Sequence, residues 1–290
     1  MAIPRSWLFV PGDRPARLQK ALRSGAEAVI CDLEDAVLPT AKADARREVA
    51  AFLASERPAG SPPLWVRING LASNLAGDDL DAIVPAAPAG VVLPKPDSVA
   101  DVARLDEMLA GREVQQGLPV GSIQVLAVVT ETAHGVTALP GYVEHPARLV
   151  ALSWGAEDLS AELGAVKNRD AHGDWLFTYR LVRSLCQLAA AAAGLPAIET
   201  VFPDFRDLAG LQKTAAQAFA EGFSGMLAIH PDQVPVINAA FSPSTEQLAE
   251  ARRVVAAFAA SSGAGAVQLD GRMLDRPHLQ AARRLLEMAR

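Results

Sequence analysis

The chain has 290 residues, half of them hydrophobic, and its 27 basic and 33 acidic residues give a net charge of −6. This length and composition predict one large α/β domain or two smaller ones with a substantial core. Charges of both signs are interspersed, and the lack of a basic block argues against a nucleic-acid partner. No apolar run is long enough to cross a membrane, and the first residues lack a signal-peptide pattern, so we expect a cytoplasmic protein without a membrane partner.

Short, nearly continuous apolar segments alternate with segments of helical periodicity along most of the chain. The apolar segments predict strands at residues 6–10, 26–33, 64–68, 90–93, 123–129, 149–153, 197–202 and 225–229. The periodic segments predict helices at residues 14–24, 41–53, 80–83, 99–109, 135–139, 176–193 and 208–221. Strands this uniformly apolar are typical of a sheet that is buried on both faces.

The alternation of strands and helices argues for parallel strand pairing. Eight such units in a chain of this length predict a (β/α)₈ TIM barrel, an α/β fold. An open, doubly wound sheet is the alternative. The lack of a glycine-rich fingerprint after the first strand makes that alternative weaker.

Two segments depart from this rhythm. Residues 159–179 read as an irregular loop, of the length that lids and binding loops have inside a barrel. Residues 261–266 are a Ser/Gly/Ala hinge, followed by residues 267–275 and a terminal helix from Pro277. We therefore expect residues 1–260 to form the catalytic barrel and residues 261–290 to form a lid over its own site or a neighbour's.

Polar residues gather where the predicted strands end. They are Asp32, Glu34, Asp35, Arg67, Asn69, Lys95, Glu131, Asp158, Asp204 and His230. Strand ends meet solvent in many proteins, so polar residues there can be ordinary. In a barrel, however, these ends converge on one mouth where active sites lie, and so dense a set of carboxylates with Arg and Lys favours a functional site.

Two of these carboxylates are candidate metal ligands. Glu131 and Asp158 each end a buried-strand pattern, and they stand one strand–helix unit apart. Two hard oxygen ligands at the ends of neighbouring parallel strands suit Mg²⁺. The alternative is a pair of capping or ion-paired acids.

Other candidates lie beside this pair. Arg67 is placed to bind a carboxylate or enolate oxygen, or to form a structural ion pair with Asp32, Glu34 or Asp35. Glu34 shares a strand face with Asp32 and would orient Arg67 or bind metal-bound water, so it is a candidate catalytic residue. Lys95, between two prolines, is either a positive charge in the mouth or an ordinary ion-paired lysine.

Basic residues on the first helix are candidates for binding phosphate. Arg14 and Lys20 would suit a phosphate-bearing carrier, with a solvated helix face as the equal alternative. His134 and His230 form no metal-ligand spacing with another His or Cys, which favours structural roles for both.

Taken together, these motifs resemble those of the citrate lyase beta-subunit-like CoA-ester lyases of the HpcH/HpaI aldolase/citrate lyase superfamily. The resemblance covers nearly the whole chain, and its combination of motifs is specific. The matching segments are residues 6–12, 31–35, 66–69, 93–95, 130–132, 155–159, 197–202 and 228–231.

The resemblance implies a TIM barrel, Mg²⁺ as cofactor, and reversible carbon–carbon cleavage of a 3-hydroxyacyl thioester. It implies that Glu131 and Asp158 hold the metal and that Arg67 binds the thioester enolate or substrate oxygens. In family members with a lid, an Asp in a Gly-x-Met-x-Asp pattern reaches the adjacent subunit's site. Residues 271–275 match this pattern, which makes Asp275 the expected acid–base residue and implies a homotrimer or a multiple of three.

The resemblance leaves the substrate open. The family contains citrate lyase beta subunits, which act on an acyl-carrier-protein thioester, and free-standing lyases for malyl-, methylmalyl- or citramalyl-CoA. Residues 228–231 are closer to the free-standing enzymes, so we expect a CoA thioester and a 2-keto acid, with CoA contacts from Arg67, Arg14, Lys20, Lys95 and His230. A citrate lyase beta subunit, a metal-dependent aldolase and a malyl-CoA thioesterase are the alternatives.

Overall fold

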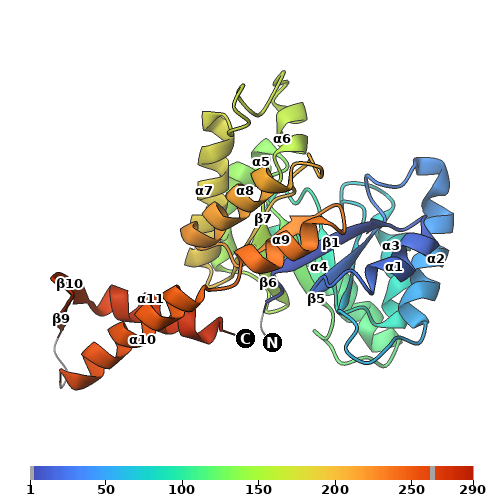
Figure 1. Cartoon of the computed structure of the whole chain (residues 1–290). Helices are drawn as coiled ribbons and strands as arrows, with labels where there is room; N and C mark the ends of the chain where they lie inside the picture. Colours follow the sequence, from blue (N-terminus) through green and yellow to red (C-terminus); the bar gives the residue numbers. More distant parts are fainter. Residues whose placement is uncertain (1–2, 262–264, 290) are drawn as a thin grey trace. The chain divides into compact units, whose positions relative to one another are not determined.

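The computed structural model of the chain describes residues 3–261 and 265–289. Its contacts divide the chain into two compact units, Met1–Asn238 and Ala239–Arg290. The first unit contains the barrel, and the second consists of a helical hairpin with a small β-hairpin (Figure 1). Among the described residues, no helix combines the length and the apolar character that crossing a membrane requires.

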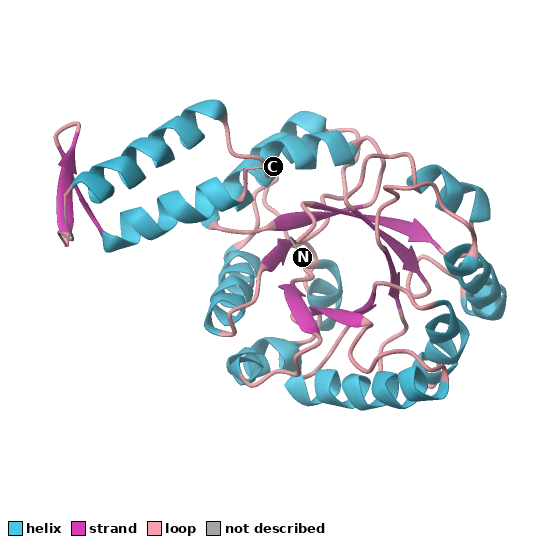
Figure 2. Ribbon diagram, turned by 90° about the horizontal axis from the view of Figure 1, so that it is seen from below, coloured by secondary structure: helices cyan, strands magenta, loops and turns pink. Residues whose placement is uncertain are grey.

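Eight parallel strands form the closed barrel, which confirms the predicted TIM-barrel fold (Figure 2). Neighbouring strands pair in chain order, and β8 returns to pair with β1. The strands are β1 (Ser6–Pro11), β2 (Ala28–Asp32), β3 (Leu64–Arg67), β4 (Gly90–Leu93), β5 (Gln124–Val128), β6 (Leu149–Ser153), β7 (Ala197–Glu199) and β8 (Gly225–Ala228).

Helices follow the strands and surround the barrel (Figure 2). In α4, Ser98 caps the first turn by accepting the Ala100 N–H, and Val102, Leu105 and Leu109 form the buried stripe. The helices that accompany the barrel strands are α1 (Pro15–Ala21), α2 (Lys42–Ala54), α3 (Ala76–Ile83), α4 (Val99–Gln115), α5 (Ala133–Ala138), α6 (Glu157–Glu162), α7 (Phe177–Ala192), α8 (Leu208–Glu221) and α9 (Gln233–Ala240), whose last two residues fall in the second unit. The 3₁₀ turns are η1 (Pro39–Ala41), η2 (Val84–Ala86) and η3 (Leu139–Val143).

Side chains from all eight strands fill the barrel interior. Trp7 and Trp65 meet edge to face with ring centroids 5.0 Å apart. Gly90 on β4 leaves the space that the Trp65 ring occupies, because a Cβ at this position would overlap the ring. The barrel is thus a packed core, and polar chemistry is restricted to its ends.

The expected irregular loop at residues 159–179 is shorter in the structure. Its first residues are helical, which was not predicted, and its last residues belong to the helix predicted at 176–193, which α7 confirms. Helix α6 extends to Glu162, and α7 begins at Phe177. Glu157 and Asp158 in the first turn of α6 favour a helix there, because negative charge stabilises a helix N-terminus. Tyr179 begins the buried stripe of α7. Only residues 163–176 lie outside these helices.

The second unit contains α10 (Thr245–Ala260), β9 (Ala266–Leu269), β10 (Arg272–Asp275) and α11 (Arg276–Glu287). The two antiparallel strands are joined by Asp270 and Gly271, both with positive φ, as a tight hairpin turn requires. Helix α10 packs against α11 around a small apolar cluster. The unit therefore begins at Ala239, before α10, whereas the sequence placed the boundary after α10, at residues 260 and 261. Residues 262–264 of the expected hinge lie outside the described residues.

Candidate functional site

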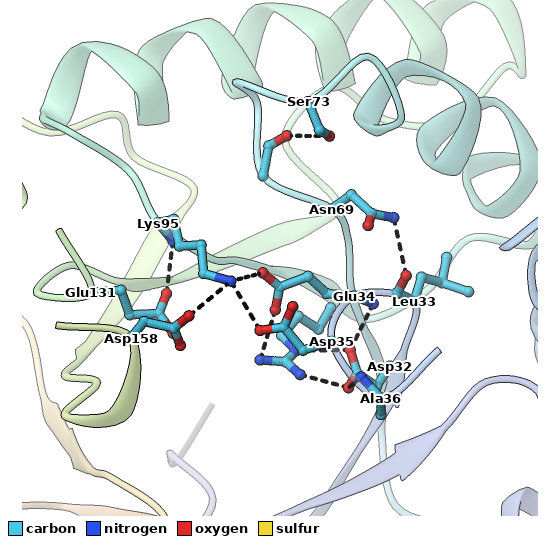
Figure 3. Close-up of polar contacts among 12 residues, drawn as sticks. Asp32, Leu33, Glu34, Asp35, Ala36, Asn69, Ser73, Lys95, Glu131 and Asp158 are labelled. Atoms are coloured by element: carbon cyan, nitrogen blue, oxygen red, sulfur yellow. Dashed lines mark hydrogen bonds and ion pairs between the residues drawn. The ribbon is translucent and has the colours of Figure 1, made fainter. Parts of the chain in front are cut away.

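Side chains that follow β2, β4, β5 and β6 converge at the barrel mouth (Figure 3). The Lys95 Nζ lies 2.6 Å from Glu34 Oε1, 2.9 Å from Asp35 Oδ2 and 3.1 Å from Asp158 Oδ1. The Lys95 backbone N–H donates to Glu131 Oε2 at 2.7 Å. The structure thus brings together Glu34, Lys95, Glu131 and Asp158, as the order of parallel strands led us to expect.

Lys95 has an unusual backbone conformation. Its φ is +51°, in the left-handed region, and prolines precede and follow it. A non-glycine residue held there costs on the order of 1–3 kcal/mol, which surrounding contacts must offset. Burial by itself lowers the pKa of Lys95, but its hydrogen bonds to Glu34 and Asp35 and the charge of Asp158 outweigh burial and raise the pKa. Lys95 is therefore a fixed cation.

Glu131 and Asp158 form a donor set that fits Mg²⁺. Glu131 is 6% exposed, and burial raises its pKa to about 8, with repulsion from Glu34 and Asp158 adding to the shift. A divalent cation between Glu131 and Asp158 would relieve that repulsion. Among the described residues, no group of three or more His, Cys, Asp or Glu could hold a metal. Two carboxylates completed by water and substrate oxygens are a usual Mg²⁺ environment.

Gly155 leaves the space for Glu131, and sequence reasoning missed its role. A Cβ at Gly155 would lie 2.5 Å from Glu131 Cγ. The Gly155 backbone N–H donates to Thr130 Oγ1 at 3.1 Å, which fixes the loop against the strand end that carries Glu131. A glycine two residues past a strand end, in the motif that carries Asp158, was the available signal.

Arg67 forms structural ion pairs, which were one of the two roles predicted for it. Its Nε and Nη2 donate to the two Asp32 oxygens at 2.7 and 2.6 Å, and Nη1 lies 2.8 Å from Glu34 Oε2. Its guanidinium also lies over the Phe9 ring at 4.8 Å. Burial alone lowers the pKa of Arg67, but Asp32 and Glu34 outweigh burial and raise it. A guanidinium carries five N–H donors, so these contacts leave donors for a substrate oxygen.

The segment that carries Asp158 is anchored by a buried tryptophan. Trp154 is fully buried, and its Nε1 donates to Glu199 Oε1 at 2.6 Å. The other Glu199 oxygen accepts from Arg183 Nε at 2.7 Å. This connection between the ends of β6 and β7 restricts movement of the loop that leads to Asp158.

The basic residues proposed for CoA lie at different ends of the barrel. Arg14 precedes α1 on the mouth side, exposed and 3.4 Å from Asp13. His230 follows β8, also on the mouth side, and stacks on Phe205 with ring centroids 4.9 Å apart. Lys20, in the last turn of α1, lines a cavity with Arg23, Glu56, Pro58 and Ser61, near the amino ends of the strands. The structure therefore does not bring Lys20 to the mouth.

Asp275 lies in the second unit. It ends β10 and occupies the N-cap of α11, and its Oδ1 lies 2.6 Å from His278 Nδ1. Its side chain is 45% exposed. In this position Asp275 caps the N-terminus of α11. Its catalytic role stays a prediction.

Comparison with known proteins identifies the family. Residues 5–231 match the HpcH/HpaI aldolase/citrate lyase family. The chain belongs to this family. It is therefore an enzyme of a family that cleaves carbon–carbon bonds, and the matched span covers the barrel from β1 to the residues that follow β8.

Relatives of this HpcH/HpaI family member extend the match beyond the barrel. A citrate lyase subunit beta-like protein of Mycobacterium tuberculosis is 40% identical, covering 98% of this chain and 94% of its own. A mitochondrial citramalyl-CoA lyase of Rattus norvegicus is 31% identical, covering 98% and 86%. The crystal structure of CitE from M. tuberculosis in complex with magnesium, acetoacetate and coenzyme A has a TM-score of 0.82 at 38% identity and covers 98% and 97%.

Proposed function

We propose that this enzyme cleaves a 3-hydroxyacyl-CoA thioester of the malyl-, methylmalyl- or citramalyl-CoA type, with Mg²⁺, into an acyl-CoA and a 2-keto acid. The observation that carries the proposal is the pair Glu131 and Asp158 at the mouth, beside the cation Lys95, with Arg67 close enough for its charge to act on Glu131. The solved relative with magnesium, acetoacetate and coenzyme A, and the relative named citramalyl-CoA lyase, support the same reading.

Glu131 and Asp158 would hold the Mg²⁺, which when bound polarises the keto-acid oxygens and lowers the pKa of the substrate hydroxyl. Arg67 would direct its remaining N–H donors at the thioester oxygen, where negative charge develops as the C–C bond breaks. Its ion pair with Asp32 fixes the guanidinium plane before the substrate binds. Stabilisation of this kind acts without reorganising the site.

Proton transfers complete the retro-Claisen cleavage. Glu34 would accept the proton of the substrate hydroxyl, since burial raises its pKa despite the opposing effect of Arg67 and Lys95. The electrons of the hydroxyl O–H bond form the keto-acid carbonyl, and those of the breaking C–C bond form the thioester enolate. Asp275 would then donate a proton to the enolate carbon, which yields the acyl-CoA.

Binding of CoA would use the mouth-side residues Arg14, Lys95 and His230. Asp275 would come from a neighbouring copy of the chain, with the second unit as its lid, so we infer a homotrimer or a multiple of three. This arrangement rests on the resemblance of residues 271–275 to the family's lid pattern.

The test is a cleavage assay on purified protein with Mg²⁺ and, in separate reactions, malyl-CoA, methylmalyl-CoA and citramalyl-CoA. Glyoxylate or pyruvate is followed as its phenylhydrazone. Release of one keto acid, abolished by EDTA, is expected and would identify the substrate. No release from any of the three thioesters would contradict the proposal.

A second candidate function is hydrolysis of malyl-CoA. It is favoured by a (3S)-malyl-CoA thioesterase of Cereibacter sphaeroides, which is 33% identical and covers 98% of this chain. A thioesterase releases free CoA thiol and malate, whereas the lyase releases acetyl-CoA and glyoxylate. A thiol reagent added to the same assay distinguishes the two products.

A further inference from the structure

A buried lysine lies next to the carboxylate cluster. Lys42, the first residue of α2, is 8% exposed. Its Nζ donates to the Leu33 carbonyl at 2.6 Å, the Glu34 carbonyl at 2.7 Å and Asn69 Oδ1 at 2.8 Å. An ammonium has three N–H donors, and all three are used.

Lys42 does not stabilise the helix that it begins. A positive charge is unfavourable at a helix N-terminus, and burying an ammonium group costs free energy. Burial lowers the pKa of Lys42, against the attraction of Asp32, Asp79 and Glu34. The compensation must come from the acceptors that the ammonium binds.

The Asn69 contact connects Lys42 to a second buried network. Asn69 Nδ2 donates to the Leu33 carbonyl at 3.0 Å and to Asp79 Oδ2 at 2.7 Å. Asp79 is fully buried on α3 and also accepts from Arg46 Nε at 2.7 Å. Lys42 therefore joins the turns that follow β2 and β3 to two surrounding helices.

The contacts of Lys42 determine how Glu34 is presented. The Leu33 and Glu34 carbonyls belong to the peptide groups on either side of the Glu34 Cα, and Lys42 binds both. The Glu34 N–H is bound by Asp32 Oδ1 at 2.9 Å. With its backbone fixed in this way, Glu34 directs one oxygen to Lys95 at 2.6 Å and the other to Arg67 at 2.8 Å.

We propose that Lys42 is the positioning residue for Glu34, holding both flanking peptide groups so that the Glu34 carboxylate keeps its place between Lys95 and Arg67. The expected effect on turnover rests on the proposed function, in which Glu34 takes the hydroxyl proton. The expected effect on the flexibility of the Glu34 backbone is independent of the proposed function.

The first measurement is steady-state kinetics of K42M, which keeps an unbranched side chain but removes the ammonium. We expect kcat to fall on the order of 10²-fold, the loss that a displacement of about 1 Å produces. KM for the thioester should change little, since no role in thioester binding is assigned to Lys42. The matched control is E113Q. Glu113 is fully buried and pairs with Arg148 at 3.0 Å, beside the amino end of β5, so E113Q should destabilise the protein without lowering kcat.

The second measurement is hydrogen–deuterium exchange of residues 33–37, read by mass spectrometry, which needs no activity. Loss of the Lys42 contacts should make the backbone N–H groups of this segment exchange roughly tenfold faster in K42M. Local opening then costs less free energy, because the hydrogen bonds to Lys42 no longer have to be broken. In E113Q the segment should exchange as in the wild-type protein. If K42M does not fold, K42Q, which keeps an N–H donor, carries both measurements with the same expected directions.

The outcomes separate the two proposals. Unchanged exchange of residues 33–37 in K42M overturns the positioning role, whatever the kinetics show. Faster exchange with wild-type kcat overturns the link between Lys42 and catalysis, as does an equal loss of kcat in E113Q. Faster exchange in K42M, together with a wild-type protein that cleaves no thioester, contradicts the proposed function and leaves the positioning role intact.

Discussion

Substitution of Gly155 by alanine tests whether the position of the Glu131 carboxylate controls activity. The φ of Gly155 lies outside the left-handed region, so alanine adopts the same backbone without strain. The added Cβ would lie 2.5 Å from Glu131 Cγ and 3.1 Å from Oε1. The perturbation is therefore one methyl group placed against one carboxylate.

The magnitude follows from these distances. Non-bonded carbon atoms pack at about 3.5–4.0 Å, so the Glu131 side chain must retreat by about 1 Å. The retreat strains the hydrogen bond that Glu131 accepts from the Lys95 N–H, now 2.7 Å long. A displacement of about 1 Å costs on the order of 10²-fold in turnover, which corresponds to about 2.7 kcal/mol of activation free energy.

The assay is thioester cleavage as a function of Mg²⁺ concentration, for wild type, G155A and the control G70A. Gly70 also lies at the mouth, but a Cβ there would be 3.6 Å from the Pro94 carbonyl oxygen and 4.0 Å from Lys95 Cβ, which is ordinary contact. We expect G155A to lose turnover and to require more Mg²⁺, and G70A to behave as wild type. Wild-type turnover and Mg²⁺ requirement in G155A would refute the role assigned to Glu131.

Three further predictions concern other residues. D275N should lower turnover on the order of 10²–10⁴-fold, as the loss of a general acid does. The fold should be kept, because Asn caps a helix N-terminus as well as Asp does. Wild-type turnover in D275N would exclude Asp275 as the acid. E131A should weaken Mg²⁺ binding in calorimetric titration, and unchanged affinity would exclude Glu131 as a ligand. Burial raises the pKa of Glu113, but hydrogen bonds from Arg148 and from the Ile123 and Gly121 N–H groups outweigh it and lower the pKa. The stability that Glu113 contributes is thus present above pH 4.5 and lost as pH falls through the lowered pKa. The difference in Tm between wild type and E113Q should therefore disappear in acid. A Tm difference that does not depend on pH would show that the ionised Glu113 carboxylate is not its source.

The sequence alone was sufficient to predict the barrel fold. Buried parallel strands need continuous apolar runs, and helices over them need apolar stripes, so both elements leave a local pattern in the chain. The convergence of Glu131 and Asp158 followed from the same reasoning, because consecutive parallel strands end side by side. The Asp270–Gly271 hairpin turn also has a local signature, because an Asp-Gly pair suits the positive φ angles of a tight hairpin turn.

The tertiary structure decided which partners the charged side chains contact, because local sequence patterns do not contain that information. Lys20 and Lys42 look alike in the sequence, as charged residues at the ends of amphipathic helices, yet Lys42 is buried against the Glu34 backbone and Lys20 lies near the amino ends of the strands. Arg67 had two open roles until the structure showed its contacts with Asp32 and Glu34. Which charge meets which partner depends on contacts between residues far apart in the chain.

The division into units shows the same limit. Helix α10 has a capping box and an amphipathic pattern that would suit either a barrel helix or a separate hairpin. Its apolar side chains pack on α11 and the β9–β10 hairpin, so it belongs to the second unit. Sequence periodicity determines that a helix forms and which of its faces is buried. Only the folded chain determines what that face packs against, because burial of apolar surface has no direction and many partners satisfy it equally.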